Sequence, residues 1–186
     1  MDLGAEYRGY TADITRTIPV SGKFSPEQKQ IYELVLLAQE EAMKACKPGM
    51  TPEKLSAITR TVINKGLKEL GIIKTENEHH LYYPHGCCHH IGLDVHDRGT
   101  YDTLKKDMVI TIEPGIYIPE GSPCDKKWWS IAVRIEDDLL ITQDGYELLS
   151  HFAPRKIEDI EKMVSQKSVI DNFKLAPLES GKKKGV

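Results

Sequence analysis

Residues 2–17 read DLGAEYRGYTADITRT, which predicts two extended segments that meet at Arg8-Gly9. Tyr, Ile and Thr are frequent in this stretch, and these residues favour strands. With a two-residue loop, paired positions on the two strands sum to an odd number. Asp2 and Asp13 then lie on the same face of the hairpin, as direct or diagonal neighbours. A three-residue loop would place them on opposite faces, so the register decides whether the two carboxylates meet.

Further downstream, His89, Glu113 and Glu136 interrupt apolar sequence that is typical of strands. Residues 109–112 form a short apolar run that ends at Glu113. Residues 131–142 alternate between apolar and polar positions, and Glu136 lies on the polar side. An ionised carboxylate in a protein interior is strongly unfavourable without a cationic partner. A pair of divalent metal ions would neutralise these two glutamates together with the two aspartates of the hairpin.

Two long helices are predicted between these segments. Ser25-Pro26 supplies an N-cap and a proline at the first helical position, so the first helix is expected to begin there and run to about Cys46. Thr51-Pro52 begins the second helix in the same way, and Gly71 ends it. Both carry apolar residues at helical spacing, namely Ile31, Leu34, Val35, Ala38 and Ala42 in the first helix and Leu55, Ile58, Val62, Leu67 and Leu70 in the second. A short last helix is predicted over 155–164.

The composition excludes several classes of protein. A chain of 186 residues with 40% hydrophobic and 28% charged residues is ordinary for a globular domain with a core. A net charge of -3 and the lack of a basic stripe argue against a nucleic-acid partner. No apolar run approaches the ~20 residues that cross a bilayer. The four cysteines are too few for a disulfide-stapled secreted domain, so we expect reduced thiols and a cytoplasmic protein. A homo-oligomer is compatible with this composition.

The segment 84–97, PHGCCHHIGLDVHD, follows sequence that becomes strand-like from Tyr82 onward, and it contains four histidines. Histidine is the commonest protein metal ligand and the natural acid–base group near neutral pH. Alone, such a cluster is as compatible with a polar turn as with a site. Cys88 or His90 could instead capture a soft metal in a Cys/His zinc site. That alternative leaves the carboxylates unexplained.

Four motifs follow one another over residues 2–138: DLGAEY to DITRT, the run from His85-Gly to His96-Asp97, TIEPG at 111–115 and VRIEDD at 133–138. In this order they resemble the pita-bread metallopeptidases, which include aminopeptidase P, prolidase and methionine aminopeptidase. The resemblance implies an α+β fold in which a curved, mostly antiparallel sheet holds metals in its concavity and carries helices on its outer face. Residues 1–165 would form part of the catalytic domain, and 166–186 a C-terminal tail that is mobile at its end.

The resemblance also implies the site. The ligands of two divalent ions would be Asp2, Asp13, His89, Glu113 and Glu136, with Asp13 and Glu136 bridging both ions. Oxygen-rich ligation with one imidazole favours manganese, with cobalt, iron or zinc as alternatives. The activity implied is hydrolysis of the N-terminal Xaa-Pro bond of peptides by a metal-activated hydroxide. Proline after the cleaved bond has no N–H and a constrained φ, which general peptidases accommodate poorly.

Three further residues are implied to act beside the metals. His96 would hydrogen-bond the substrate carbonyl or the tetrahedral oxyanion, and His85 would hold the residue after the cleaved bond. Glu113 would also carry the proton from water to the leaving nitrogen. Arg134 shares a strand face with Glu136, so it could orient that carboxylate or reach substrate. A plain ion pair is the alternative for Arg134.

The beginning of the chain departs from the family pattern. Family members carry a further half-repeat of the catalytic domain before the strand that bears the first aspartate, whereas Asp2 is the second residue here. We therefore expect an N-terminally truncated form of the fold. A ligand close to a chain end is poorly preorganised. The alternative function is a truncated, non-catalytic fragment or binding module with little activity alone.

Overall fold

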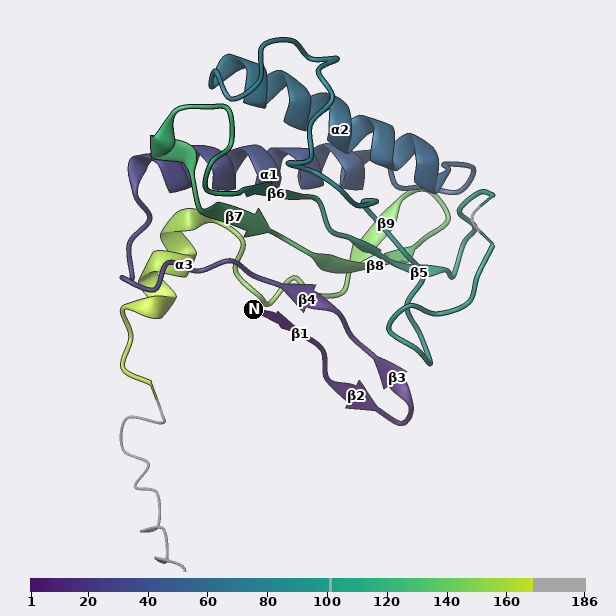
Figure 1. Cartoon of the computed structure of the whole chain (residues 1–186). Coiled ribbons are helices and arrows are strands. Elements are labelled where there is room, and N and C mark those ends of the chain that lie inside the picture. Colours follow the sequence, from purple (N-terminus) through teal and green to yellow (C-terminus); the bar gives the residue numbers. More distant parts are fainter. Residues whose placement is uncertain (101, 169–186) are drawn as a thin grey trace, which may run out of the picture.

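Antiparallel strands and two long helices form the body of the structure, a computed structural model that describes residues 1–100 and 102–168. Helix α1 (Pro26–Ala45) packs against the strands, and α2 (Pro52–Glu69) packs on α1 (Figure 1). The predicted α+β architecture with helices on one side of the sheet is confirmed. α1 makes the main contacts with the strands, and α2 forms an outer layer. From residue 169 onward, the tail predicted for 166–186 lies outside the described residues.

The N-terminal hairpin has the two-residue loop that the sequence predicts. Its four short strands are β1 (Asp2–Leu3), β2 (Glu6–Tyr7), β3 (Tyr10–Thr11) and β4 (Ile14–Thr15). Arg8 and Gly9 both have positive φ (55° and 85°), as a type I′ turn requires. Asp2 pairs with Thr15, so Asp2 and Asp13 are diagonal neighbours on one face. The predicted register is confirmed.

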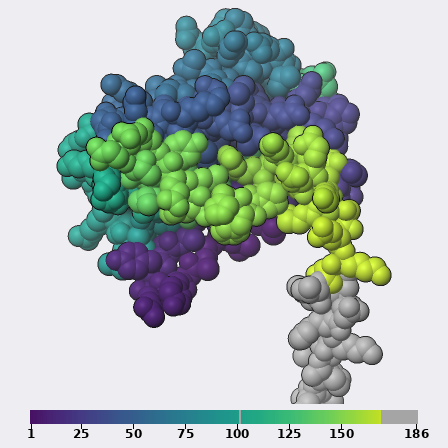
Figure 2. Space-filling view, turned by 180° about the vertical axis from the view of Figure 1, so that it is seen from behind, coloured from purple at the N-terminus to yellow at the C-terminus, as the bar shows by residue number. Residues whose placement is uncertain are grey.

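Gly4 allows the two hairpin strands to approach closely. In the register set by the strand pairs, Gly4 lies opposite Asp13. A β-carbon at Gly4 would overlap the backbone carbonyl oxygen of Ala12. The hairpin projects from the body of the molecule, as Figures 1 and 2 both show. Its closure therefore depends on a residue without a side chain.

Helix α1 has the boundaries and the buried face that the sequence predicts. The Ser25 side chain accepts a hydrogen bond from the Gln28 N–H, and the Gln28 side chain accepts one from the Ser25 N–H. This capping box satisfies two backbone donors that the first turn leaves unpaired. The predicted apolar residues of α1 are buried in the core: Ile31, Leu34, Val35, Ala38 and Ala42.

The apolar face predicted for α2 packs on the core, although its burial is uneven. Leu55 and Leu67 are buried, and Thr59 and Ile63, which the predicted pattern did not include, complete the buried face. Val62 and Leu70 are half-buried and pack against the core, and Ile58 is half-buried. The Thr59 hydroxyl lies 3.0 Å from the Tyr83 hydroxyl, so a polar residue is satisfied in the core at this point. This partner comes from a distant segment, which the periodicity of α2 does not reveal.

The strands under α1 form two antiparallel groups. Strands β5 (Val109–Ile112), β8 (Asp137–Ile141) and β9 (Tyr146–Leu148) pair in the order β5-β8-β9, and β6 (Gly115–Ile118) pairs with β7 (Ile131–Arg134). The alternating run predicted over 131–142 is interrupted at Ile135-Glu136, between β7 and β8. The N–H of Glu136 donates to the Thr15 carbonyl (3.1 Å). This bond connects the hairpin to the sheet.

The prediction of strand-like structure from Tyr82 onward is wrong for most of the segment. Residues 82–100 contain no regular strand and form only an isolated bridge to β5. The N–H groups of Thr111 and Glu113 nevertheless donate to the carbonyls of His89 and Cys87. The segment therefore follows the edge of β5 as an irregular chain.

The remaining elements close the fold at its C-terminal side. A 3-10 turn, η1 (Lys126–Trp128), precedes β7, and α3 (Ile157–Val164) falls within the predicted range 155–164. Within residues 1–100 and 102–168, no helix has the length and apolarity needed to cross a membrane.

Removing the cap of α1 is expected to destabilise the fold modestly. Ser25→Ala should lower the free energy of unfolding by about 1 kcal/mol, because the N-cap oxygen that accepts the Gln28 N–H is lost. Urea unfolding of the parent chain and the variant measures this difference. Ser25→Thr keeps a capping hydroxyl and serves as the control. Equal losses in the two variants would contradict the assigned cap.

Candidate metal centre

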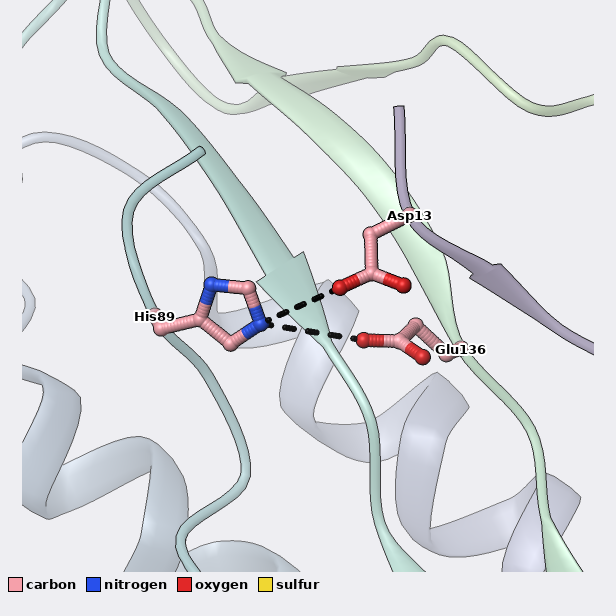
Figure 3. Close-up of side chains that lie close together, drawn as sticks. All are labelled: Asp13, His89 and Glu136. Atoms are coloured by element: carbon pink, nitrogen blue, oxygen red, sulfur yellow. Dashed lines mark ion pairs between the residues drawn. The ribbon is translucent and has the colours of Figure 1, made fainter. Parts of the chain in front are cut away.

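Three segments that are far apart in the sequence bring Asp13, His89 and Glu136 together (Figure 3). Asp13 precedes β4, His89 comes from the irregular chain along β5, and Glu136 occupies the break between β7 and β8. One candidate ligand atom from each lies within 4.8 Å of the others. His89 Nε2 is 3.5 Å from Asp13 Oδ2 and 3.9 Å from Glu136 Oε1. The imidazole therefore faces both carboxylates across a space that one ion could occupy.

Glu113 and Asp2 lie at different distances from this group. Glu113, directly after β5, places Oε1 3.3 Å from His89 Nε2, although it falls outside the mutually close trio. Asp2 lies at the rim, where its carboxylate pairs with the Arg134 guanidinium and its side chain is 51% exposed. The structure thus gathers three of the predicted carboxylate ligands around the imidazole of His89 and leaves Asp2 beside Asp13 at the edge.

Hydrogen bonds orient the groups that face the centre. His89 Nδ1 donates to the His90 carbonyl (3.0 Å), so the neutral ring carries its free lone pair on Nε2, toward the carboxylates. The His89 N–H donates to Thr111 Oγ1 (3.2 Å), which anchors the irregular chain to β5. These contacts prepare the imidazole to act as a metal ligand through Nε2.

Sequence reasoning missed two residues that touch the predicted ligands. Thr15 Oγ1 donates to Glu136 Oε2 at 2.5 Å. Asp138 Oδ2 accepts the N–H of Asp13 (3.1 Å), and Asp138 Oδ1 is buried without a partner among the described residues. Each lies two positions after a predicted ligand, Thr15 after Asp13 and Asp138 after Glu136. Strand alternation, which puts such residues on one face, was the available signal.

His85 and Arg134 are linked through Tyr117, another residue that the sequence did not single out. His85 Nε2 lies 2.8 Å from the Tyr117 hydroxyl, and Arg134 Nη1 donates to the same oxygen (3.3 Å). Arg134 Nε is 3.8 Å from Glu136 Oε2. Arg134 therefore contacts both Asp2 and Glu136, and its role stays a prediction.

The other histidines of segment 84–97, His90 and His96, have different surroundings. His96 is exposed, and its ring meets the His89 ring edge-on with centroids 4.5 Å apart. His90 Nε2 instead lies 3.0 Å from the Thr100 carbonyl. Within residues 1–100 and 102–168, the one group with the spacing of a metal site contains no cysteine. The Cys88/His90 zinc alternative therefore has no support in this geometry.

Burial raises the pKa of the carboxyl groups at the centre. Desolvation, with Glu113 and Asp13 nearby, raises the pKa of Glu136 to about 8. Desolvation also raises the pKa of Asp13 and of Glu113, and it brings the pKa of Asp138 to about 6. A bound cation favours the ionised form and would reverse these shifts. An oxygen-rich set with one imidazole and an excess of buried negative charge fits divalent ions.

Glu136→Gln is expected to stabilise the metal-free chain at alkaline pH. The folded chain keeps a proton on Glu136 up to about pH 8, whereas the unfolded chain loses it near the ordinary value of 4.5. The stability of the parent chain therefore falls as pH rises from about 5 to about 8, and glutamine, which cannot ionise, removes this contribution. Urea unfolding in chelator across that range measures it.

The exposed Glu33→Gln on α1 is the matched control and should follow the parent chain. If Glu136→Gln and the parent lose stability equally between about pH 5 and about pH 8, the raised pKa of Glu136 is refuted.

Comparison with known proteins identifies the family. The sequence pattern of metallopeptidase family M24 matches residues 1–143. The mitochondrial intermediate cleaving peptidase 55 of Arabidopsis thaliana is 40% identical over 189 residues, which cover 100% of this chain and 38% of that protein. The Xaa-Pro aminopeptidase of Escherichia coli is 38% identical and is matched over 88% of this chain and 40% of its own length.

Solved structures agree with this relationship. A variant of Escherichia coli aminopeptidase P in complex with substrate superposes with a TM-score of 0.84 at 38% identity, covering 88% of this chain and 40% of that one. Aminopeptidase P II from Yersinia pestis gives the same TM-score and coverage. The chain spans about two fifths of the length of these relatives. Its fold is the corresponding part of the predicted pita-bread fold. From sequence and structure alike, the chain belongs to metallopeptidase family M24.

Proposed function

We propose that this chain carries the metal centre of an aminopeptidase that hydrolyses the N-terminal Xaa-Pro bond of peptides. The observation that carries the proposal is the convergence of Asp13, His89 and Glu136, with Glu113 in contact with the same imidazole. The names of the relatives from Escherichia coli and Haemophilus influenzae, both Xaa-Pro aminopeptidases, support the reaction class. The predicted substrate is a peptide with proline in the second position.

The predicted ligands would divide between two ions. Asp13 and Glu136, whose carboxylates face the same imidazole, would bridge the ions. His89 and Glu113 would complete one site, and Asp2 the other. When bound, divalent ions supply Lewis acidity and an acidified water at neutral pH. Manganese is the ion we favour, because hard oxygen donors dominate the set.

The residues around the ligands would handle the substrate and its protons. Glu113 would accept the proton of the attacking water and pass it to the leaving nitrogen, a role that suits a carboxyl whose pKa is raised by burial. His96, exposed beside His89, would donate to the oxyanion. His85, with Tyr117 at its Nε2, would hold the residue after the cleaved bond. Arg134 would orient Glu136 and Asp2.

The cysteines are the basis for a proposed cellular location. All four are free thiols, which supports a reducing compartment, and we propose the cytoplasm. The name of the Arabidopsis relative places that protein in mitochondria. Association of the chain with itself would be compatible with its composition.

One observation favours a second candidate function, a non-catalytic fragment or binding module. The side chain of Asp2 is 51% exposed at the rim of the site. A ligand that is this exposed is held less firmly than the buried ones. Metal content and turnover separate the two candidates.

Asp13→Asn is expected to abolish manganese-stimulated hydrolysis of an Xaa-Pro-Yaa peptide. The amide cannot supply the negative charge that a bridging position requires, while the helices keep their caps and core. Hydrolysis with and without Mn²⁺, together with metal analysis of the purified chain, measures the effect.

Asp94→Asn, on an exposed loop residue, is the matched control and should behave as the parent chain does. A parent chain that holds no metal and shows no manganese-stimulated cleavage would favour the fragment or binding module. Unchanged turnover in Asp13→Asn would refute the role of Asp13.

A further inference from the structure

A buried polar cluster lies on the side of β8 that faces α1, away from the metal-facing carboxylates. Its centre is Asp137, which is fully buried and sits in sequence between Glu136 and Asp138. Asp137 Oδ1 accepts from Arg16 Nη2 (2.6 Å), and Oδ2 accepts from Gln39 Nε2 (2.9 Å). We call these three residues, Arg16, Gln39 and Asp137, the clamp. None of the three belongs to the predicted site.

The clamp holds the backbone on both sides of Glu136. Gln39 Nε2 lies 3.2 Å from the carbonyl oxygen of Ile135, and Arg16 Nη1 donates to the carbonyl oxygen of Glu136 itself (2.6 Å). Glu136 lies in the break between β7 and β8, outside both strands. Arg16 and Gln39 both donate to the Asp137 carboxylate. They therefore also hold the two peptide units on either side of the Glu136 α-carbon.

Gln39 also reaches the second glutamate. The same Nε2 lies 3.0 Å from the carbonyl oxygen of Ile112, the residue before Glu113. Ile112 ends β5, whereas Ile135 follows β7, and both carbonyls meet one amide on α1. The two N–H groups of the carboxamide are shared among these two carbonyls and Asp137 Oδ2, and in this way Gln39 ties together the two backbone segments from which Glu113 and Glu136 project.

The surroundings fix the orientation of the clamp. Arg155 Nη1 donates to Gln39 Oε1 (3.1 Å), so the amide nitrogen must point to the two carbonyls. Arg16 further donates to the carbonyls of Thr15, Ala153 and Pro154 at 2.8–3.0 Å. Its guanidinium is buried with all its donor directions used. A fully satisfied buried network of this kind is rigid, and loss of one member leaves its partners unpaired.

We propose that the clamp positions Glu113 and Glu136 relative to each other, and that Gln39 sets their spacing. The part of this inference that concerns ion binding rests on the proposed function. The clamp residues touch neither ion nor substrate, so they are positioning residues. Methionine at position 39 keeps the length of the side chain and removes the donors, which leaves the carbonyls of Ile112 and Ile135 without this partner.

The test compares Gln39→Met with two controls. Gln30→Met makes the same change at an exposed position of α1, and Ile63→Ala weakens the core on α2 without touching the clamp. Amide hydrogen exchange of the metal-free chain is measured by NMR at Glu113 and Glu136, with Ile141 at the far end of β8 as the internal reference. Isothermal titration with MnCl₂ alone then gives the affinity for the ion.

In Gln39→Met, exchange at Glu113 and Glu136 is expected to accelerate at least about tenfold relative to Ile141, and neither control should change that ratio. Affinity for Mn²⁺ should fall by about 10- to 100-fold, the range typical of residues that orient ligands. Unchanged exchange ratios, or faster exchange with unchanged affinity, would overturn the proposal while the proposed function stands. If the parent chain binds no Mn²⁺, the proposed function fails, and the exchange ratios alone decide whether Gln39 positions the two glutamates.

Discussion

The crowding of carboxylates around one imidazole is the constraint on which the rest of the structure depends. Asp13 and Glu136 are almost fully buried, and Glu113 is partly so. Water can solvate these charges only weakly, which is why their pKa values rise. Such an arrangement is unfavourable on its own and becomes favourable when cations are bound. The hairpin register, the irregular chain along β5 and the break before β8 all serve to produce it.

The buried carboxylates on the two sides of β8 have different hydrogen-bond partners. Asp137, which faces α1, accepts hydrogen bonds from an arginine, a glutamine and Ser150, so its charge is satisfied within the protein. Asp138, which faces Asp13, keeps one buried oxygen without a partner among the described residues. Neighbouring aspartates on one strand thus separate a structural charge from one that belongs to the site. This difference fits a cation site on the side of β8 that faces Asp13, and a core on the other side that needs no cation.

Sequence reasoning succeeded where the determining contacts are local. The loop at Arg8-Gly9 sets the hairpin register, and the caps at Ser25 and Thr51 set the beginnings of both helices. It failed where the determining partner is distant. The core position of Thr59 depends on Tyr83, and the irregular course of residues 82–100 depends on the edge of β5, neither of which periodicity reveals. The convergence of Asp13, His89 and Glu136 followed from motif order, whereas the contacts of Thr15 and Asp138 needed coordinates. The assigned roles stay predictions.

Gly4 allows the two aspartates of the N-terminal hairpin to lie close together. The two arms of the hairpin that carry Asp2 and Asp13 can lie this close because Gly4 has no β-carbon. Any side chain at position 4 would therefore force the backbone of the hairpin to shift, and the spacing of the two aspartates would change with it.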